Sequence, residues 1–442
     1  MTVAVVRGPA RLSRALVLVM AVATGLAVAN NYYAQPLLPL IGRDLHLGAD
    51  VSGLIVTVAQ AGYALGLFFL LPLGDLLERR RLVVALSVAT AGGLVWLGSA
   101  GSAAVLLPAA LVVGACSVLA QVLVPFAASL AADHERGQVV GMVMSGLLIG
   151  ILLARTLAGF LAETGTWRVV YFAAAGAMLA QAVVLRWRLP TWRERPGLHY
   201  GSLLGSVVAL MGQEPLLRRR ALYGFFSFGT FSVLWTSMAF LLAHRYHYSS
   251  GVIGLFGLAG AAGAVTATVA GRLSDRGRAS RSTYAATALL ALSWLALWAG
   301  SSSVVALIVG VVVLDIGAQG LQITNQSEIY RLRPEARSRL TAAYMVIYFV
   351  GGAIGSAVSA ALYDHLGWDG VCLAGAAFAV AALVASLALE RRPTAAGAQR
   401  SPASTQDQGT RPARRQTGGL VVQSTTVEGS PSHRPPSTTS AT

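Results

Sequence analysis

Long apolar stretches recur at short intervals along most of this 442-residue chain, and they restrict its fold more than any other feature. A helix that crosses a bilayer needs about 20 mostly apolar residues. Only 12% of the residues are charged, against roughly 25% in a soluble domain. The sequence therefore predicts an all-α membrane protein.

By this rule we expect twelve transmembrane helices. The expected spans are residues 15–39, 51–73, 82–100, 103–130, 138–162, 168–188, 219–243, 251–272, 282–300, 303–326, 339–363 and 369–389. The first span begins as a signal peptide does, with basic residues before it and small residues at Ala27 and Ala29. We reject that interpretation because the apolar run resumes after Pro36 and because cleavage would leave an odd number of spans.

The basic residues predict the orientation of the chain. All of them are arginines, and they give a net charge of +15. They gather in alternate breaks between the apolar runs, whereas the opposite breaks hold only Arg43, Arg168 and Arg245. Because basic loops stay on the cytoplasmic side, both termini are expected in the cytoplasm. This arrangement gives no support to a nucleic-acid partner.

The spans divide into two halves of six helices. We expect an N-terminal half at 15–188, a cytoplasmic linker at 189–218 and a C-terminal half at 219–390. The tail at 391–442 is rich in Ser, Thr, Pro, Gly and Gln, and is expected to be disordered.

The two halves resemble each other in sequence. Residues 135–167 align without gaps on 336–368, which places Gly150 on Gly351 and Trp167 on Trp368. A duplicated six-helix unit explains this repeat, and in many transporters such a repeat encloses the substrate site near the middle of the membrane.

Several short stretches carry a family resemblance. "GRLSDRGR" (271–278) matches the cytoplasmic loop signature of the major facilitator superfamily, and "GDLLERRR" (74–81) is a degraded copy. The chain resembles this superfamily over about residues 15–390. "NNYYAQPLLPL", "PLGDLLERRRLV" and "NQSEIYRLRPEARSR" are similar to the bacterial drug:proton antiporter branch, which includes a purine-nucleoside exporter.

Two departures from that branch concern its mechanism. The fifth span has no proline after Gly150, and the fourth has Gln121 where the branch has an intramembrane arginine. The resemblance implies alternating access, with both cytoplasmic loops acting as latches. The latch residues would be Asp75 and Arg79 in the first loop, and Gly271, Asp275, Arg276, Gly277 and Arg278 in the second. The alternative is that these charges only fix the membrane orientation.

A polar cluster interrupts the first span. Asn30, Asn31, Tyr32 and Gln35 lie together in its outer half, close to Pro36. One hypothesis is that they line a central cavity. The other is that they form hydrogen bonds between helices, near a carbonyl that the proline leaves unpaired.

Asp315 and Arg155 are the charged residues placed well inside a span. Asp315 is expected ~18 Å from the start of its span at 1.5 Å per residue. An ionised acid there costs several kcal/mol unless it is paired or hydrated, so Asp315 is the candidate proton carrier, or else a structural acid. Arg155 would pair with Asp315, attract an anionic substrate or extend to the outer surface.

Further polar residues are weaker cavity candidates. Gln319 and Gln322 share a helix face with Asp315, because they follow it by four and seven residues. The others are Gln60, Tyr63, Gln121, Trp235, Tyr344 and Tyr348, and packing between helices explains each of them equally well.

The sequence contains no P-loop and no HExxH motif, so we do not expect an enzyme. A lipid-processing membrane enzyme and a receptor are the remote alternatives. The predicted function is secondary active transport across the bacterial cytoplasmic membrane. We expect proton-coupled efflux of a small molecule, driven by the proton gradient without cofactor or metal. The alternative is a proton symporter or uniporter that imports a metabolite. The expected partners are the substrate and membrane lipids, and the chain is expected to be monomeric.

Overall fold

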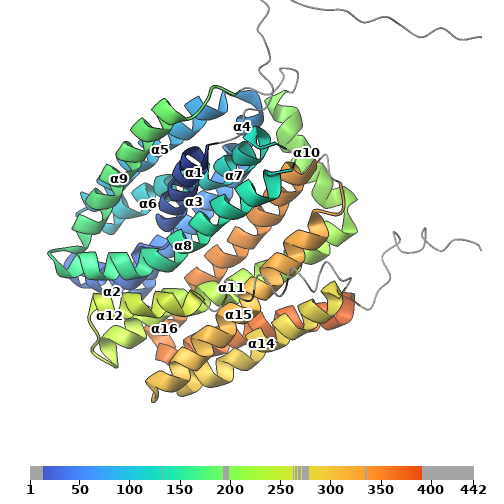
Figure 1. The fold of residues 1–442 in the computed structure, drawn as a ribbon. Helices are drawn as coiled ribbons and strands as arrows, with labels where there is room; N and C mark the ends of the chain where they lie inside the picture. Colours follow the sequence, from blue (N-terminus) through green and yellow to red (C-terminus); the bar gives the residue numbers. More distant parts are fainter. Residues whose placement is uncertain are drawn as a thin grey trace, which may run out of the picture. The chain divides into compact units, whose positions relative to one another are not determined.

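The computed structural model describes residues 13–132, 134–192, 199–261, 278–333 and 336–390, with the single positions 263, 266 and 270. Every element in these ranges is helical (Figure 1). The helices before the linker are α1 (Arg14–Ala29), α2 (Ala34–Leu45), α3 (Ala49–Phe69), α4 (Leu73–Leu76), α5 (Arg79–Gly98), α6 (Ala103–Cys116), α7 (Leu119–Leu130), α8 (Arg136–Glu163) and α9 (Trp167–Arg188). After them come α10 (Tyr200–Gln213), α11 (Pro215–His244), α12 (Ser250–Leu255), the 3-10 helix η1 (Phe256–Gly260), α14 (Ala279–Ala299), α15 (Val304–Ile329) and α16 (Arg337–Leu389).

Within the described ranges, ten helical segments are long and apolar enough to cross a membrane. Together they cover every predicted span except 251–272. The beginning of that span is the short apolar helix Ser250–Gly260, and most of its remainder lies outside the described residues. The last two predicted spans form α16, which Gly367 divides with a φ of 62° and a ψ of −149°. The prediction of an all-α membrane protein is confirmed.

The polar cluster of the first span lies at a break between helices rather than inside one. Asn31 and Tyr32 donate their backbone N–H groups to Val28 (3.2 Å) and Ala29 (2.9 Å), as in a tight turn. Helix α2 then begins at Ala34, and Pro36 falls in its first turn, where a missing N–H group costs nothing. The assumption of a continuous helix through these residues was therefore wrong, and the turn re-orients Tyr32 relative to α1.

Glycines bring paired helices into backbone contact at two equivalent places. A Cβ atom on Gly150 would lie within 2.5 Å of the Gly25 Cα atom, and one on Gly146 would meet Ala21. In the second half, Gly355 meets Gly229 in the same way, and Gly351 meets Phe225. By these contacts Gly351 corresponds to Gly146 rather than to Gly150, one helical turn away from the ungapped alignment.

The linker contains a helix that packs on the protein. Leu203, Val207 and Leu210 of α10 are buried at a spacing of four and three residues, which gives one apolar stripe. The hydroxyl group of Tyr200 donates to the backbone carbonyl of Phe69 (2.7 Å), so the start of α10 is fixed to the end of α3.

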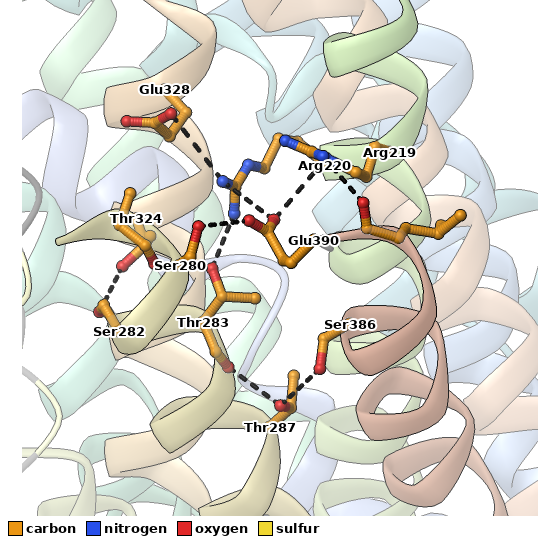
Figure 2. Close-up of polar contacts among 12 residues, drawn as sticks. Arg219, Arg220, Ser280, Ser282, Thr283, Thr287, Thr324, Glu328, Ser386 and Glu390 are labelled. Atoms are coloured by element: carbon orange, nitrogen blue, oxygen red, sulfur yellow. Dashed lines mark hydrogen bonds and ion pairs between the residues drawn. The ribbon is translucent and has the colours of Figure 1, made fainter. Parts of the chain in front are cut away.

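A buried ion cluster joins four helix ends in the second half (Figure 2). The guanidinium group of Arg220, at the start of α11, lies 3.1 Å from Glu390 and 3.9 Å from Glu328. It also donates to Thr283 of α14 (2.7 Å). Arg219 contacts the same carboxylate oxygen at 3.7 Å. The side chains of Arg220 and Glu390 are 1% and 2% exposed, so this cluster is a structural tie between helix ends rather than a solvated surface patch.

Candidate functional site

Arg155 of α8 is enclosed where helices from both sides of the linker meet. Its side chain is 3% exposed. Its Nε–H group donates to Oε1 of Gln35 (2.5 Å), and its guanidinium carbon lies 3.8 Å from the ring centroid of Trp235 and 4.8 Å from that of Tyr32. Aromatic faces attract a guanidinium group through the negative potential above the ring. The cation is therefore stabilised by rings and one amide oxygen.

Asp315 of α15 lies at the N–H edge of the same indole. Its side chain is 2% exposed, and its Oδ1 atom accepts a hydrogen bond from Nε1 of Trp235 (3.3 Å). Gly260 of η1 makes room for the carboxylate, since a Cβ atom there would lie 3.2 Å from Oδ2. Trp235 thus contacts the acid through its N–H group and the cation through its ring face.

Among the described residues, no carboxylate comes within ion-pair distance of Arg155. The direct pair with Asp315 that the sequence suggested is replaced here by a connection through Trp235. The alternative in which Arg155 extends to the outer surface does not fit its burial. Two opposite charges therefore face one site without touching.

Both charged residues line a cavity of about 120 Å³. Apolar side chains form most of its wall. Its lining consists of Leu148, Ile149, Ile151, Leu152, Arg155, Phe231, Gly257, Gly260, Ala261, Asp315 and Gln319. A carboxylate, a guanidinium and an amide set into apolar walls suit an amphiphilic organic molecule with a few polar groups.

Other predicted cavity residues divide into those at the site and those elsewhere. Tyr32 and Gln35 contact Arg155, and Gln319 lines the cavity. Asn30 is turned away, since its Nδ2 atom donates to the Ala27 carbonyl (3.2 Å). Asn31 is 8% exposed, and neither polar atom of its side chain has a hydrogen-bond partner among the described residues.

The remaining candidates join helices to one another. Nε2 of Gln60 donates to Ser232 (3.2 Å) across the contact between α3 and α11. Gln121 donates to the Tyr63 hydroxyl (3.4 Å), and Gln322 accepts from the Tyr344 hydroxyl (2.6 Å). Tyr348 stacks on Phe228, with ring centroids 4.1 Å apart. Asp315 and Gln319 therefore share the cavity, whereas Gln322 does not line it.

The first predicted latch loop contacts both sides of the linker. Asp75 lies 3.5 Å from Arg79, which donates to Ser129 of α7 (3.2 Å). Asp75 also borders a small hollow with Ser338 and Arg339 of α16. In the second loop, Gly271, Asp275, Arg276 and Gly277 lie outside the described residues, and Arg278 is the exposed residue before α14.

The end of α8 is fastened to α12, which lies beside it (Figure 1). Thr156 donates to the Gly254 carbonyl (2.9 Å), and Ser250 donates to the Gly159 carbonyl (3.0 Å). At the last residue of α8, Glu163 accepts from the backbone N–H of Gly251 (2.8 Å). The arginine pattern predicts that this end is the outer one, so these contacts join α8 to α12 on that side of the site.

Sequence reasoning gave too little weight to three features. Trp235 was only a minor candidate, because a tryptophan in an apolar run is typical of packing. Glu163 carried no signal beyond its place at a helix end. Arg220 was counted among the orientation-setting arginines, although its burial and its partner Glu390 set it apart.

Comparison with known proteins finds one family of membrane transporters. The chain matches the Major Facilitator Superfamily over residues 20–327 and 221–427. It is 54% identical over 375 residues to the putative uncharacterized transporter YgaY of Escherichia coli K12, covering 84% of this chain and 95% of that protein. It is 36% identical over 380 residues to the probable transporter SCO4007 of Streptomyces coelicolor, covering 85% and 87%.

The fold is also similar to that of a solved structure. The nucleoside transporter NupG superposes with a TM-score of 0.68 at 13% identity, covering 84% of this chain and 99% of that one. At that identity the likeness concerns the fold alone.

Proposed function

This chain belongs to the major facilitator superfamily and is a multi-pass membrane transporter of a small molecule, and from that premise we propose that it is a proton-coupled exporter in which Asp315 carries the proton. The observation that supports this proposal is the position of Asp315. The carboxylate is buried, borders the cavity and has, among the described residues, one neutral hydrogen-bond donor. Such a group exchanges a proton more readily than it tolerates an isolated charge.

The local charge explains how a proton would matter. With Asp315 ionised, the cavity wall carries one negative and one positive charge. With Asp315 protonated, Arg155 is left as the only charge among the described lining residues. A buried cation without a counter-ion is costly, so proton binding favours a conformation in which water reaches the site. That is the requirement for coupling a proton to alternating access.

The contacts around the site support alternating access itself. The site lies between helices of the two halves, and the Glu163–Gly251 hydrogen bond joins those halves at one end. We propose that contacts at this end break when the protein opens to the outside. The latch role of Asp75 and Arg79 is part of the same proposal, because Asp75 and Arg339 border one hollow at the other end.

Efflux is the proposed direction. It is supported by the resemblance of the first span and the cytoplasmic loops to drug:proton antiporters, and by the apolar cavity walls, which suit amphiphilic compounds. The proposed location is the bacterial inner membrane.

The first test measures accumulation of a compound panel that includes nucleosides, dyes and antibiotics. The host cells lack their own efflux pumps and express either the wild type or Asp315→Asn. A matched control is Asp369→Asn, since Asp369 also accepts an indole hydrogen bond, from Trp298 at 2.9 Å, but is exposed.

Export by the wild type and by the control, with no export by Asp315→Asn, supports the proposal. Equal export by all three proteins would show that Asp315 is not needed for coupling. Increased uptake by wild-type cells would contradict the direction and favour a proton symporter or uniporter.

A further inference from the structure

We propose that Trp235 transmits the protonation state of Asp315 to the contact between the two halves at Arg155. The inference rests on the proposed function, because it takes Asp315 as the proton carrier. It adds a positioning residue that converts a change of charge on α15 into a change of contact on α8.

The geometry forms a continuous series across the site. Asp315 of α15 accepts from the N–H group of Trp235 on α11 at 3.3 Å. The face of the same indole lies 3.8 Å from the guanidinium carbon of Arg155 on α8, whose Nε donates to Gln35 of α2 at 2.5 Å. Asp315 and Trp235 follow the linker in sequence, whereas Arg155 and Gln35 precede it. The stacking of indole on guanidinium is therefore the step that crosses between halves.

The surroundings of Trp235 leave its orientation dependent on this hydrogen bond. Its side chain is 2% exposed, and the neighbouring ring of Phe231 is tilted by 41° at a centroid distance of 6.0 Å. Phe231 offers no hydrogen-bond acceptor to the indole. Among the described residues, Asp315 is the acceptor for the indole N–H group, so a weaker bond there removes the polar contact that holds the indole between Asp315 and Arg155.

The charge step is simple. A proton passes from water to an oxygen of Asp315, the carboxylate becomes a neutral carboxyl group, and no covalent bond in the protein breaks. Hydrogen bonds to ionised acceptors are roughly twice as strong as those to neutral ones, so protonation loosens Trp235. It also removes the negative charge that offsets Arg155. Both changes weaken the stack and favour a conformation in which Arg155 reaches water.

Few other groups can produce the same pH response at this site. Three described titratable groups interact electrostatically with Asp315: Arg155 of α8, Tyr32 of the turn before α2, and Tyr348 of α16. Tyrosine phenols titrate at about pH 10 and guanidinium groups above about pH 12. Residues 261–270 contain no titratable side chain. A response between pH 5.5 and 8.5 that is lost in Asp315→Asn therefore belongs to Asp315, whereas a response of His244 or His247, beside the label at position 245, would persist in that variant.

The test measures the conformation and needs no known substrate. Spin labels are attached at Thr164→Cys and Arg245→Cys, two exposed positions near the α8–α12 contact, after Cys116 and Cys372 are replaced by serine. Pulsed electron paramagnetic resonance then gives the distance distribution of the full-length protein in liposomes at pH 5.5 and 8.5.

Three variants are compared with this background. Asp315→Asn removes the proton site. Trp235→Phe keeps an aromatic face for Arg155 but removes the N–H group. Trp294→Phe is the matched control, since Trp294 is also buried and donates to Thr230 (2.8 Å), away from the site. If Trp235→Phe does not fold, benzothienylalanine is incorporated at position 235 instead, because it replaces the indole N–H group with sulfur at nearly the same volume.

In the background protein and in Trp294→Phe, we expect the ratio of long to short label distances to change by about fivefold between the two pH values. This is the effect of one hydrogen bond of ordinary strength. We expect no pH-dependent change in Asp315→Asn. In Trp235→Phe we expect a smaller change than in the background, because protonation still removes the charge that offsets Arg155 but no longer acts through the indole N–H group. A Trp235→Phe response equal to the background would overturn the role of Trp235 while leaving Asp315 as the proton carrier. A normal response in Asp315→Asn, or none in the background, would overturn both.

Discussion

Replacing Arg220 with methionine should destabilise the protein strongly, although this arginine lies far from the cavity. The change removes a buried cation and leaves the carboxylate of Glu390 in place, 2% exposed, with Arg219 at 3.7 Å and Ser280 as a hydrogen-bond donor at 2.6 Å. Breaking a buried ion pair by removing one partner costs about 3–5 kcal/mol. Because Arg219 and Ser280 remain, we expect a loss of about 3 kcal/mol.

The pair of Arg81 and Glu78, in which only the arginine is exposed, provides the internal standard. The side chain of Arg81 is 85% exposed and lies 3.4 Å from Glu78. Exposed pairs contribute about 0–1 kcal/mol, so Arg81→Gln should have little effect. Equilibrium unfolding in mixed micelles, with SDS titrated against a mild detergent, gives both free energies on the same scale.

A double variant separates the ion pair from a general packing defect. Arg220→Met combined with Glu390→Leu removes both charges and should be more stable than Arg220→Met alone, because the buried carboxylate that has lost its closest cation is also gone. If Arg220→Met costs no more than Arg81→Gln, or if the double variant loses the sum of the two single losses, the cluster is not a buried electrostatic tie.

Two further predictions concern helix contacts. Gly150→Ala should lower the folded yield and the melting temperature, because its Cβ atom would lie 2.3 Å from the Gly25 carbonyl oxygen. Gly141→Ala is the control, since a Cβ atom there has open space, and this change should be neutral or slightly stabilising. Fluorescence-detected size-exclusion chromatography after heating measures both variants, and equal losses would contradict this reasoning. Glu163→Gln should increase the rate at which a membrane-impermeant maleimide labels a cysteine introduced at Ser250, because the charge-assisted hydrogen bond to the α12 backbone is lost. An unchanged labelling rate would show that Glu163 does not stabilise the contact between α8 and α12.

Much of the architecture could be predicted because a bilayer imposes a simple rule on sequence. Each crossing needs a long apolar run, so the spans could be read from hydropathy, and the break in α16 at Gly367 falls between two predicted spans. The same rule singled out Asp315 and Arg155, since charges are costly inside a membrane. Both residues are buried and border one cavity.

The arrangement around those charges could not be predicted, because it depends on how distant helices face one another. Asn30 and Gln35 belong to one polar cluster in the sequence. The turn between α1 and α2 directs Gln35 toward Arg155, while Asn30 remains against Ala27. The proline at position 36 marks irregular backbone, but it does not indicate that the break precedes it.

Arg220 illustrates a second reason. The positive-inside rule counts every arginine near a helix end alike, so the run Arg218–Arg220 was read only as a signal of orientation. Whether one of them is buried depends on a carboxylate 170 residues later, at Glu390. A rule based on charge counts cannot separate a solvated arginine from one held between helix ends.

The central pair of charges also decides how the direction of transport can be determined. Arginine stays protonated at all physiological pH values, so protonation of Asp315 changes the charge of the pair only between zero and one positive charge. A substrate that binds through Asp315 competes with the proton, and its binding must release one. A substrate that binds through Arg155 is favoured when Asp315 is protonated, so its binding must take up a proton.

Release of a proton on substrate binding corresponds to antiport and export, and uptake of a proton corresponds to symport and import. Proton release or uptake by the purified protein, measured in weakly buffered solution when a transported compound is added, therefore distinguishes the two. Uptake of a proton would contradict the proposed efflux.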